Sequence, residues 1–219
     1  MSFFYPIIAA LSLCGIISCS MSATVQIDLK KLVAYSSIAH MNLVVLGIFS
    51  LNLQAIQGSI LLMLAHGLVS SGLFFLVGFL YDRHHSRVIT YYSGLAQPMP
   101  VFTTLLFLFF LANVSFPITA NFVGEILLLI GVVQKSFVAA FFAATGIILS
   151  AIYSFFAFGR VAFMGVSPFI ESHLEISSLE FQTVWYFFFL IIVLGVKPGL
   201  VLDITDYSVM FLLVDVQEF

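Results

Sequence analysis

The sequence predicts an all-α protein built as a membrane bundle of about six transmembrane helices, one of them discontinuous. Hydrophobic residues make up 62% of the 219 residues and charged residues only 8%, and the mean hydropathy is +1.20. A soluble domain carries about 25% charged residues, so this chain lacks the polar groups to cover a water-exposed surface. A helical span needs about 20 apolar residues, and five or six such spans account for most of the length.

Six apolar segments follow one another along the chain, separated by short polar stretches and without a low-complexity linker. We therefore expect a single transmembrane domain over residues 1–219. The segments lie near 3–24, 32–51, 56–80, 101–134, 137–163 and 182–202. The first begins at Phe3 with no basic region before it, which argues against a cleavable signal peptide and against an Arg-rich presequence.

The fourth segment, 101–134, is too long for one straight span. It would reach about 50 Å, whereas the hydrocarbon core of a bilayer is about 30 Å thick. Its middle reads "SFPITAN", and Pro117 removes a backbone donor and clashes with the preceding turn, so the helix is expected to break there. One discontinuous span fits this segment, and so do two short spans.

Basic residues in the loops predict the orientation of the spans. With one discontinuous span, five of them share a side: Lys30, Lys31, Arg83, Arg87 and Arg160. Lys135 and Lys197 then lie on the opposite side, and with two short spans only Arg160 changes side. The rule thus predicts that the loops at 25–31 and 82–100 face the matrix or cytoplasm, and it leaves the nature of the break open.

Ionisable residues inside the apolar segments are few, and such residues are costly in a membrane and often functional. They are His40 in the second segment, His66 in the third and Glu125 after the predicted break. Ser36 precedes His40 by one helical turn and Ser70 follows His66 by one turn, so each histidine has a hydroxyl neighbour on its own helix face.

A histidine, a hydroxyl and a carboxyl group on separate helices form a candidate proton relay. Histidine titrates near neutral pH, and the charge of a buried carboxyl group responds to burial and to neighbouring cations. The alternatives are that Glu125 hydrogen-bonds the broken backbone, that the histidines are packing residues, and that the serines join helices. Lys30 and Lys31 are first of all topology anchors, although a basic pair at the mouth of a span is also suited to feed protons.

The remaining polar residues are interpreted as surface groups. His84 and His85 are expected to be solvated, and so are three glutamates of the last long loop: Glu171, Glu175 and Glu180. Tyr91, Tyr92 and Trp185 are expected in the interfacial aromatic belt. The chain has no phosphate-binding Gly-rich loop, dinucleotide motif, Cys-x-x-Cys pair or pair of axial haem ligands, so no redox centre or bound cofactor is predicted, and nothing suggests nucleic-acid binding.

Three stretches carry a family resemblance: "DLKKLVAYSSIAHMNLVVLG", "HGLVSSGLFFLVGFLYDRHHSR" and "GLAQPMPVFTTLLFLFFLANVSFPITANFVGEILLL". They resemble subunit 4 of NADH dehydrogenase, respiratory complex I, and more distantly the Mrp-type cation/proton antiporter subunits. The resemblance runs from about Asp28 to Arg160. It implies the second inverted repeat and the last helix of an antiporter-like bundle, and it favours one discontinuous span at 101–134.

The resemblance also implies roles and partners. Glu125 matches the carboxylate of the broken helix in the central proton axis, His40 and His66 match histidines of the second half-channel, and Asp28 with Lys30 and Lys31 lies at its matrix-side mouth. FMN, iron–sulfur clusters and quinone are expected in other subunits of a mitochondrial inner-membrane complex that reduces ubiquinone with NADH. The implied neighbours are the antiporter-like subunits 2 and 5, further complex I subunits and membrane lipid.

The chain departs from the family in two respects. The spans that precede this half are missing, together with their internal lysines, so we expect a split subunit whose N-terminal half is a separate polypeptide. The break also lacks the glycines usual in the family and has only Pro117. Two other functions stay open: a subunit of a cation/proton antiporter, and a half-subunit that only holds the membrane arm together.

Overall fold

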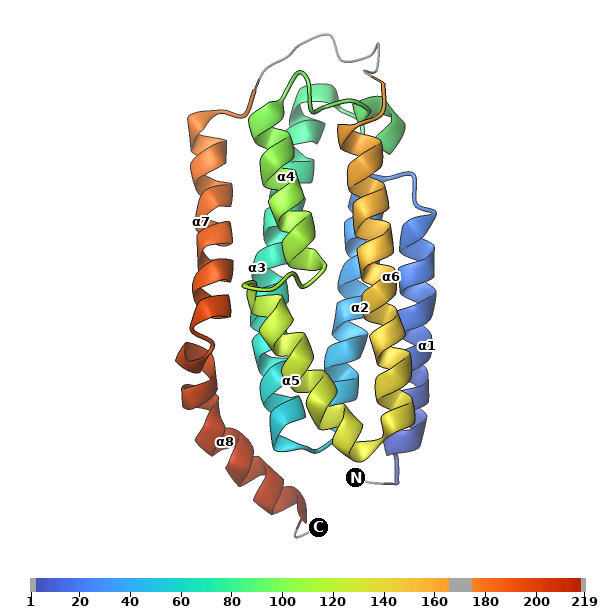
Figure 1. Cartoon of the computed structure of the whole chain (residues 1–219), viewed down its shortest axis with the longest axis vertical. Helices are drawn as coiled ribbons and strands as arrows, with labels where there is room; N and C mark the ends of the chain where they lie inside the picture. Colours follow the sequence, from blue (N-terminus) through green and yellow to red (C-terminus); the bar gives the residue numbers. More distant parts are fainter. Residues whose placement is uncertain (1–2, 166–174, 218–219) are drawn as a thin grey trace.

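A computed structural model describes residues 3–165 and 175–217, and this part of the chain is almost entirely helical (Figure 1). Glu171 lies outside the described residues. Eight α-helices and one short 3-10 helix follow in this order: α1 (Tyr5–Thr24), α2 (Leu29–Phe49), α3 (Leu53–His84), η1 (Ile89–Tyr92), α4 (Pro100–Asn113), α5 (Ala120–Lys135), α6 (Phe137–Ala162), α7 (Ser178–Val196) and α8 (Gly199–Gln217).

The predicted all-α class and the discontinuous span are confirmed. Five of the described helices are long and apolar enough to cross a membrane: α1, α2, α3, α6 and α7. The sixth crossing consists of α4 and α5, which have 14 and 16 residues and together run from one end of the bundle to the other (Figure 1). Neither reaches the length of about 20 residues that a single span requires, so both are needed.

Helix α3 is the centre of the bundle and packs against α2, α4, α5, α7 and α8. It extends to His84, beyond the expected end near residue 80, because the helix stops only where His85 adopts a left-handed conformation with φ of 50°. Helices α1, α2 and α6 form one side of the bundle, and α7 lies at the opposite edge (Figure 1). The apolar run expected at 182–202 is divided, because Pro198 cannot continue α7 and α8 leaves at an angle.

The discontinuous crossing also fixes the distribution of basic residues. Because α4 and α5 together form one crossing, the end of α6 that carries Arg160 lies at the same end of the bundle as the loops at 25–28 and 85–99 (Figure 1). Arg160 donates a hydrogen bond to the Thr24 carbonyl oxygen at 3.0 Å, which ties this end together. Five basic residues therefore share one end, as the one-span alternative predicted.

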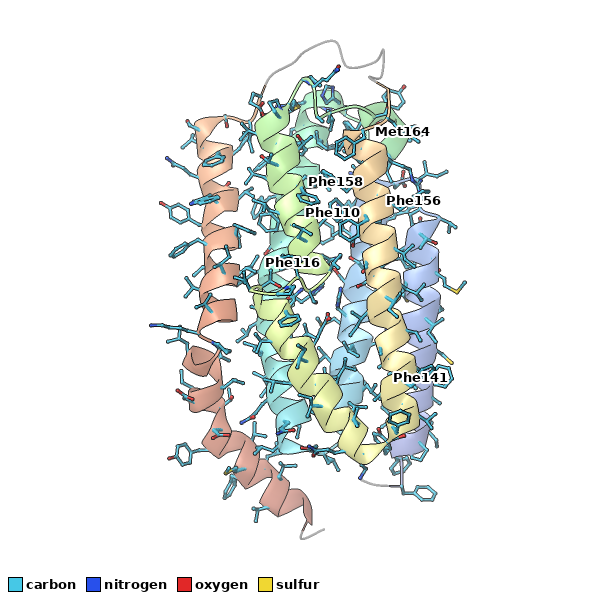
Figure 2. All side chains as sticks on the ribbon, in the orientation of Figure 1. Phe110, Phe116, Phe141, Phe156, Phe158 and Met164 are labelled. Carbon is cyan, nitrogen blue, oxygen red and sulfur yellow. The ribbon has the colours of Figure 1, made fainter. Side chains whose placement is uncertain are left out.

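The apolar core is divided into two clusters. One lies toward the 85–99 loop and includes Val33, Val69 and Ala112, whereas the other lies toward the opposite end and includes Leu43, Leu62 and Leu128. Figure 2 shows Phe110 and Phe158 of the first cluster side by side between α4 and α6, with ring centroids 6.4 Å apart. On α2, α3 and α5, the residues between the two clusters include the candidate relay groups.

Candidate functional site: a buried polar cluster at the helix break

Three ionisable side chains from three helices meet in the middle of the bundle. His40 of α2, His66 of α3 and Glu125 of α5 are 5%, 4% and 3% exposed. The Nδ1 atom of His40 lies 3.1 Å from Oε1 of Glu125, and the rings of His40 and His66 have centroids 4.9 Å apart with an interplanar angle of 36°. The structure thus brings together all three residues that the sequence nominated for a proton relay.

The close packing of α3 against α5 directs Glu125 toward α2. Three glycines permit this packing: Gly58, Gly124 and Gly131. A Cβ atom at Gly58 would lie 2.5 Å from the backbone nitrogen of Leu128, so the two backbones approach more closely than any larger residue allows. Small residues at helix contacts are the usual means of close packing in membranes.

The break lies beside this cluster and has its own backbone partners. Helix α4 ends at Asn113 and α5 begins at Ala120. Between them the Phe116 amide donates to the Leu111 carbonyl oxygen at 3.1 Å, and the side chain of Asn121 donates to the carbonyl oxygen of Ala112 at 3.1 Å. In the described residues the freed backbone is therefore satisfied by a turn and by Asn121, and Glu125 makes no hydrogen bond to it.

The break has no glycine of its own, but a glycine of α7 packs against it. Ser115 and Ile118 adopt left-handed conformations, with φ of 61° and 87°, although neither is glycine. A Cβ atom at Gly195 of α7 would overlap the carbonyl oxygen of Ile118. The backbone of α7 therefore lies directly against the break and restricts it to this geometry.

The cluster is surrounded by further polar side chains, which were not predicted from the sequence. Asn113 donates to the Ser154 hydroxyl group at 3.4 Å, and the Tyr153 side chain, which is fully buried, faces Asn113, Ser36 and Glu125. The signal for them was present in the sequence, because "YS" interrupts the apolar run of α6 and Asn113 immediately precedes the break. Hydropathy alone did not distinguish these residues from interhelical packing residues.

The other nominated residues lie at different places. Ser36 is buried near Tyr153, and its hydroxyl group donates to the Val33 carbonyl oxygen at 2.8 Å. Ser70 is half-buried and bonds the Gly67 carbonyl oxygen of its own helix, so it makes no hydrogen bond to His66. Pro117 is exposed and occupies the break.

Asp28, Lys30 and Lys31 lie at the start of α2, which is about 18 Å along the helix from His40. Asp28 and Lys31 form an ion pair of 3.5 Å there, with side chains 33% and 67% exposed. The position of these residues at the end of the bundle agrees with a role as anchors or as the mouth of a pathway.

The expectation of a surface position is wrong for several residues. Tyr92 is 1% exposed and shares its one hydroxyl hydrogen between the carbonyl oxygens of Leu80 and Ser86, and burial raises its pKa to about 12. Glu180 pairs with Arg83 at 2.6 Å, and the Glu175 carboxylate accepts a hydrogen bond from the Phe102 amide at 3.1 Å. These two glutamates bind protein groups because the start of α7 packs against the ends of α3 and α4.

His84 is likewise only half-buried rather than solvated, because its ring packs against Tyr92 with a centroid distance of 5.7 Å. His85, Tyr91 and Trp185 are exposed, as surface residues should be.

The buried cluster has the chemistry of a proton-exchange site. Several of its atoms have no hydrogen-bond partner among the described residues: Nε2 of His40, both ring nitrogens of His66 and Oδ1 of Asn113. A carboxyl group within 3.1 Å of an imidazole is close enough to exchange a proton with it. In residues 3–165 and 175–217 no group of three or more His, Cys, Asp or Glu side chains is arranged to hold a metal ion.

Comparisons with known proteins identify relatives of the chain. A family model described as "NADH:quinone oxidoreductase/Mrp antiporter, TM" matches residues 1–153. Two relatives are named NADH-ubiquinone oxidoreductase chain 4, from Marchantia polymorpha and from Arabidopsis thaliana. Each is 48% identical to this chain over 94% of the chain's length. The chain spans 42% of each of these relatives.

Solved structures agree with the fold. A chain of respiratory complex I from Thermus thermophilus superposes with a TM-score of 0.89 at 28% identity, covering 97% of this chain and 45% of that chain. A chain of the Mrp complex from Dietzia sp. DQ12-45-1b superposes with a TM-score of 0.81 at 16% identity, covering 94% and 47%. At 16% identity the second likeness concerns the fold alone.

Proposed function

Because the chain belongs to the NADH:quinone oxidoreductase/Mrp antiporter transmembrane family, we propose that it relays protons in the membrane arm of an NADH:ubiquinone oxidoreductase. It is the C-terminal half of an antiporter-like subunit 4. One observation carries the proposal: His40, His66 and Glu125 converge from three helices in a buried site between two apolar clusters. Burying three ionisable groups together is costly in a membrane, which favours a functional reason for their presence.

The proposal assigns the redox chemistry to other subunits. FMN, the iron–sulfur clusters and the quinone site would be held elsewhere in a complex of the mitochondrial inner membrane. The neighbours would be the antiporter-like subunits 2 and 5, and the N-terminal half of the subunit would be a separate polypeptide in contact with α1 and the α2–α3 pair. Apolar side chains exposed on α1, such as Ile7, Leu11 and Met21, are suited to meet a partner helix or lipid.

Replacing Glu125 by glutamine in the assembled complex tests the relay. Glu125→Gln keeps the shape of the side chain but removes the group that exchanges a proton with His40, so NADH-driven proton transport should fall by about tenfold or more. The measurement is proton uptake by vesicles containing the complex, together with NADH:ubiquinone reductase activity. Asp82→Asn removes an exposed carboxylate at the end of α3 and is the matched control.

The result separates the candidate functions. Wild-type transport in the Glu125→Gln complex would reject the relay and leave a structural role for the chain. The second candidate, a cation/proton antiporter subunit, is supported by the shared fold of the Mrp complex. It predicts sodium-dependent proton exchange that needs no NADH, and the same vesicles measure it when a sodium gradient replaces NADH.

A further inference from the structure

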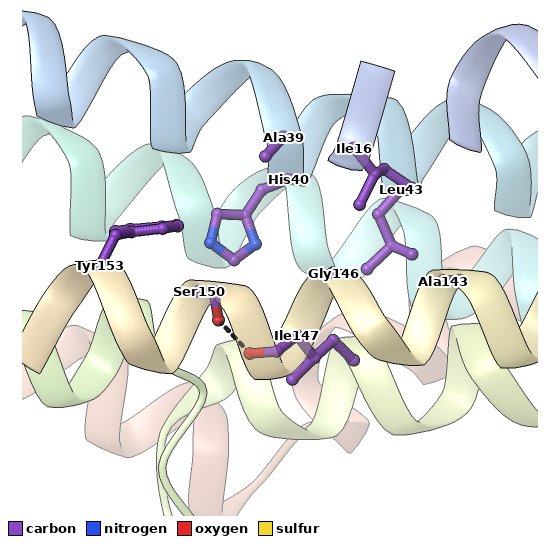
Figure 3. Close-up of a pocket in the computed structure, with 9 residues that line it drawn as sticks. All are labelled: Ile16, Ala39, His40, Leu43, Ala143, Gly146, Ile147, Ser150 and Tyr153. Carbon is purple, nitrogen blue, oxygen red and sulfur yellow. Dashed lines mark hydrogen bonds between the residues drawn. The ribbon is translucent and has the colours of Figure 1, made fainter. Parts of the chain in front are cut away.

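Helix α6 adds a small cavity to the buried cluster, lined by His40 but not by Glu125. The cavity has a volume of about 20 Å³ and lies between α1, α2 and α6. Figure 3 shows its lining: the His40 imidazole and the Tyr153 ring point toward one another, and Ser150 projects from α6 below the imidazole. Ile16 and Leu43 close the cavity at its apolar end.

The cavity has the size and the polar groups that an internal water molecule needs. About 10–15 Å³ of such volume holds one water, and a buried water has two to four polar partners. His40 Nε2 has no hydrogen-bond partner among the described residues, and the Tyr153 hydroxyl group, which faces Asn113 and Ser36, can both donate and accept. Both side chains are at most 5% exposed. Ser150 donates its hydroxyl hydrogen to Ile147 at 2.7 Å, which leaves its oxygen free to accept.

We propose that this cavity binds one water molecule between His40 Nε2, Ser150 and Tyr153, and that Tyr153 is a positioning residue for the His40–Glu125 pair. The inference rests on the proposed relay and extends it to α6. The water satisfies His40 Nε2 while Nδ1 faces Glu125, so it holds the imidazole in the orientation that proton exchange requires. The Tyr153 hydroxyl group joins this water to the side of the cluster formed by Ser36 and Asn113.

The titratable groups around the cavity are few. His40 on α2 and Tyr153 on α6 line it, and His40 in turn contacts Glu125 on α5 and His66 on α3. The described residues of α1 contribute only Ile16 to the lining. A change in water binding therefore acts on His40 and, through it, on Glu125.

The test replaces the two hydroxyl groups in the assembled complex. Tyr153→Phe and Ser150→Ala each remove one partner of the water and leave the helix packing nearly unchanged. Each should lower NADH-driven proton transport about two- to tenfold, the effect of losing one hydrogen bond, and should shift the pH profile of transport. Tyr5→Phe is the matched control, because Tyr5 is also a buried tyrosine but lies at the N-terminal end of α1, near Lys135.

The outcomes distinguish this inference from the relay itself. If Glu125→Gln abolishes transport while both hydroxyl variants keep the wild-type rate and pH profile, the water site is rejected and the relay stands. If Glu125→Gln has no effect, the relay fails first. If Tyr153→Phe does not assemble, which native gel electrophoresis detects, Ser150→Ala decides, because it lies in the cavity wall and not in the apolar core.

Discussion

At the scale of single residues, the 3.1 Å approach of His40 to Glu125 is the central feature of the site. A carboxyl group and an imidazole so close together can exchange a proton directly. The neighbouring His66 ring brings a third titratable group into contact with His40. The three side chains therefore form a continuous contact from α5 through α2 to α3, along which a proton can pass.

If the two residues act as one unit, the effects of removing them should not multiply. We expect His40→Ala, Glu125→Gln and the double variant to lower proton transport to a similar low level, as is found for residues that act together. Initial rates of NADH-driven transport in vesicles measure the three losses. The double variant His40→Ala with Asp82→Asn is the control. If the losses caused by His40→Ala and Glu125→Gln multiply in their double variant, the two residues do not act as one unit.

At the scale of the helices, the contact between α3 and α5 determines where Glu125 lies. A methyl group added at Gly58 would meet the backbone of α5 at Leu128, which cannot move as a side chain can. Gly67 lies on the same helix, and a Cβ atom there would meet nothing within 4 Å. The two glycines therefore allow a matched comparison.

Gly58→Ala should destabilise the packing by about 1–3 kcal/mol, the usual cost of overfilling a well-packed contact. Gly67→Ala should be neutral or slightly stabilising, because alanine favours a helix by about 1 kcal/mol over glycine. The thermal stability of the purified complex and the yield of the chain in it measure both effects. Equal stability of the two variants would show that the α3–α5 contact adapts more easily than the geometry indicates.

A second contact between elements joins the start of α7 to α3 and α4. Arg83 binds the Glu180 carboxylate at 2.6 Å and the Glu175 carbonyl oxygen at 3.4 Å. The Glu175 carboxylate accepts from the Phe102 amide in the first turn of α4, where no residue of α4 itself supplies a side-chain cap. A negative charge at a helix N-terminus also interacts favourably with the helix dipole.

Glu175→Ala should therefore loosen the first turn of α4. The loss of a helix cap costs about 1 kcal/mol, which corresponds to roughly fivefold faster opening. Hydrogen exchange of the peptide that contains Phe102 measures it, with the peptide at the start of α6 as an internal reference. Unchanged exchange at Phe102 would mean that α4 does not depend on this cap.

At the scale of the whole molecule, the chain is a bundle with much apolar surface outside its own contacts. It spans about two-fifths of the length of its curated relatives, and α7 and α8 carry exposed apolar residues such as Tyr186, Ile204 and Phe211. The bilayer covers part of such a surface, and neighbouring helices are expected to cover the rest.

Gentle purification from the native membrane, followed by mass spectrometry, should therefore recover the chain within a large assembly. We expect redox subunits and a second membrane polypeptide that supplies the N-terminal half and contains an intramembrane lysine. Recovery with cation-antiporter subunits alone would favour the second candidate function. Recovery without any partner would contradict the split-subunit proposal.

The sequence by itself determined the membrane class, the break at Pro117 and the three ionisable residues of the cluster. These features follow from local properties, because hydropathy and the conformational limits of proline depend on neighbours along the chain. Local pattern also misplaced the last apolar run, since hydropathy averaged over 182–202 does not register Pro198.

Only the tertiary structure decided which residues meet. It places His40 against Glu125, assigns Asn121 to the freed backbone at the break, and brings Tyr153 of α6 to the cluster. It also shows that Tyr92 is a buried hydrogen-bond donor and that α4 and α5 form one crossing. The physical reason is that contacts between helices depend on how the helices pack. Here glycines let two backbones approach closely, and the contacting segments are far apart in the sequence, so no local pattern records which of them meet.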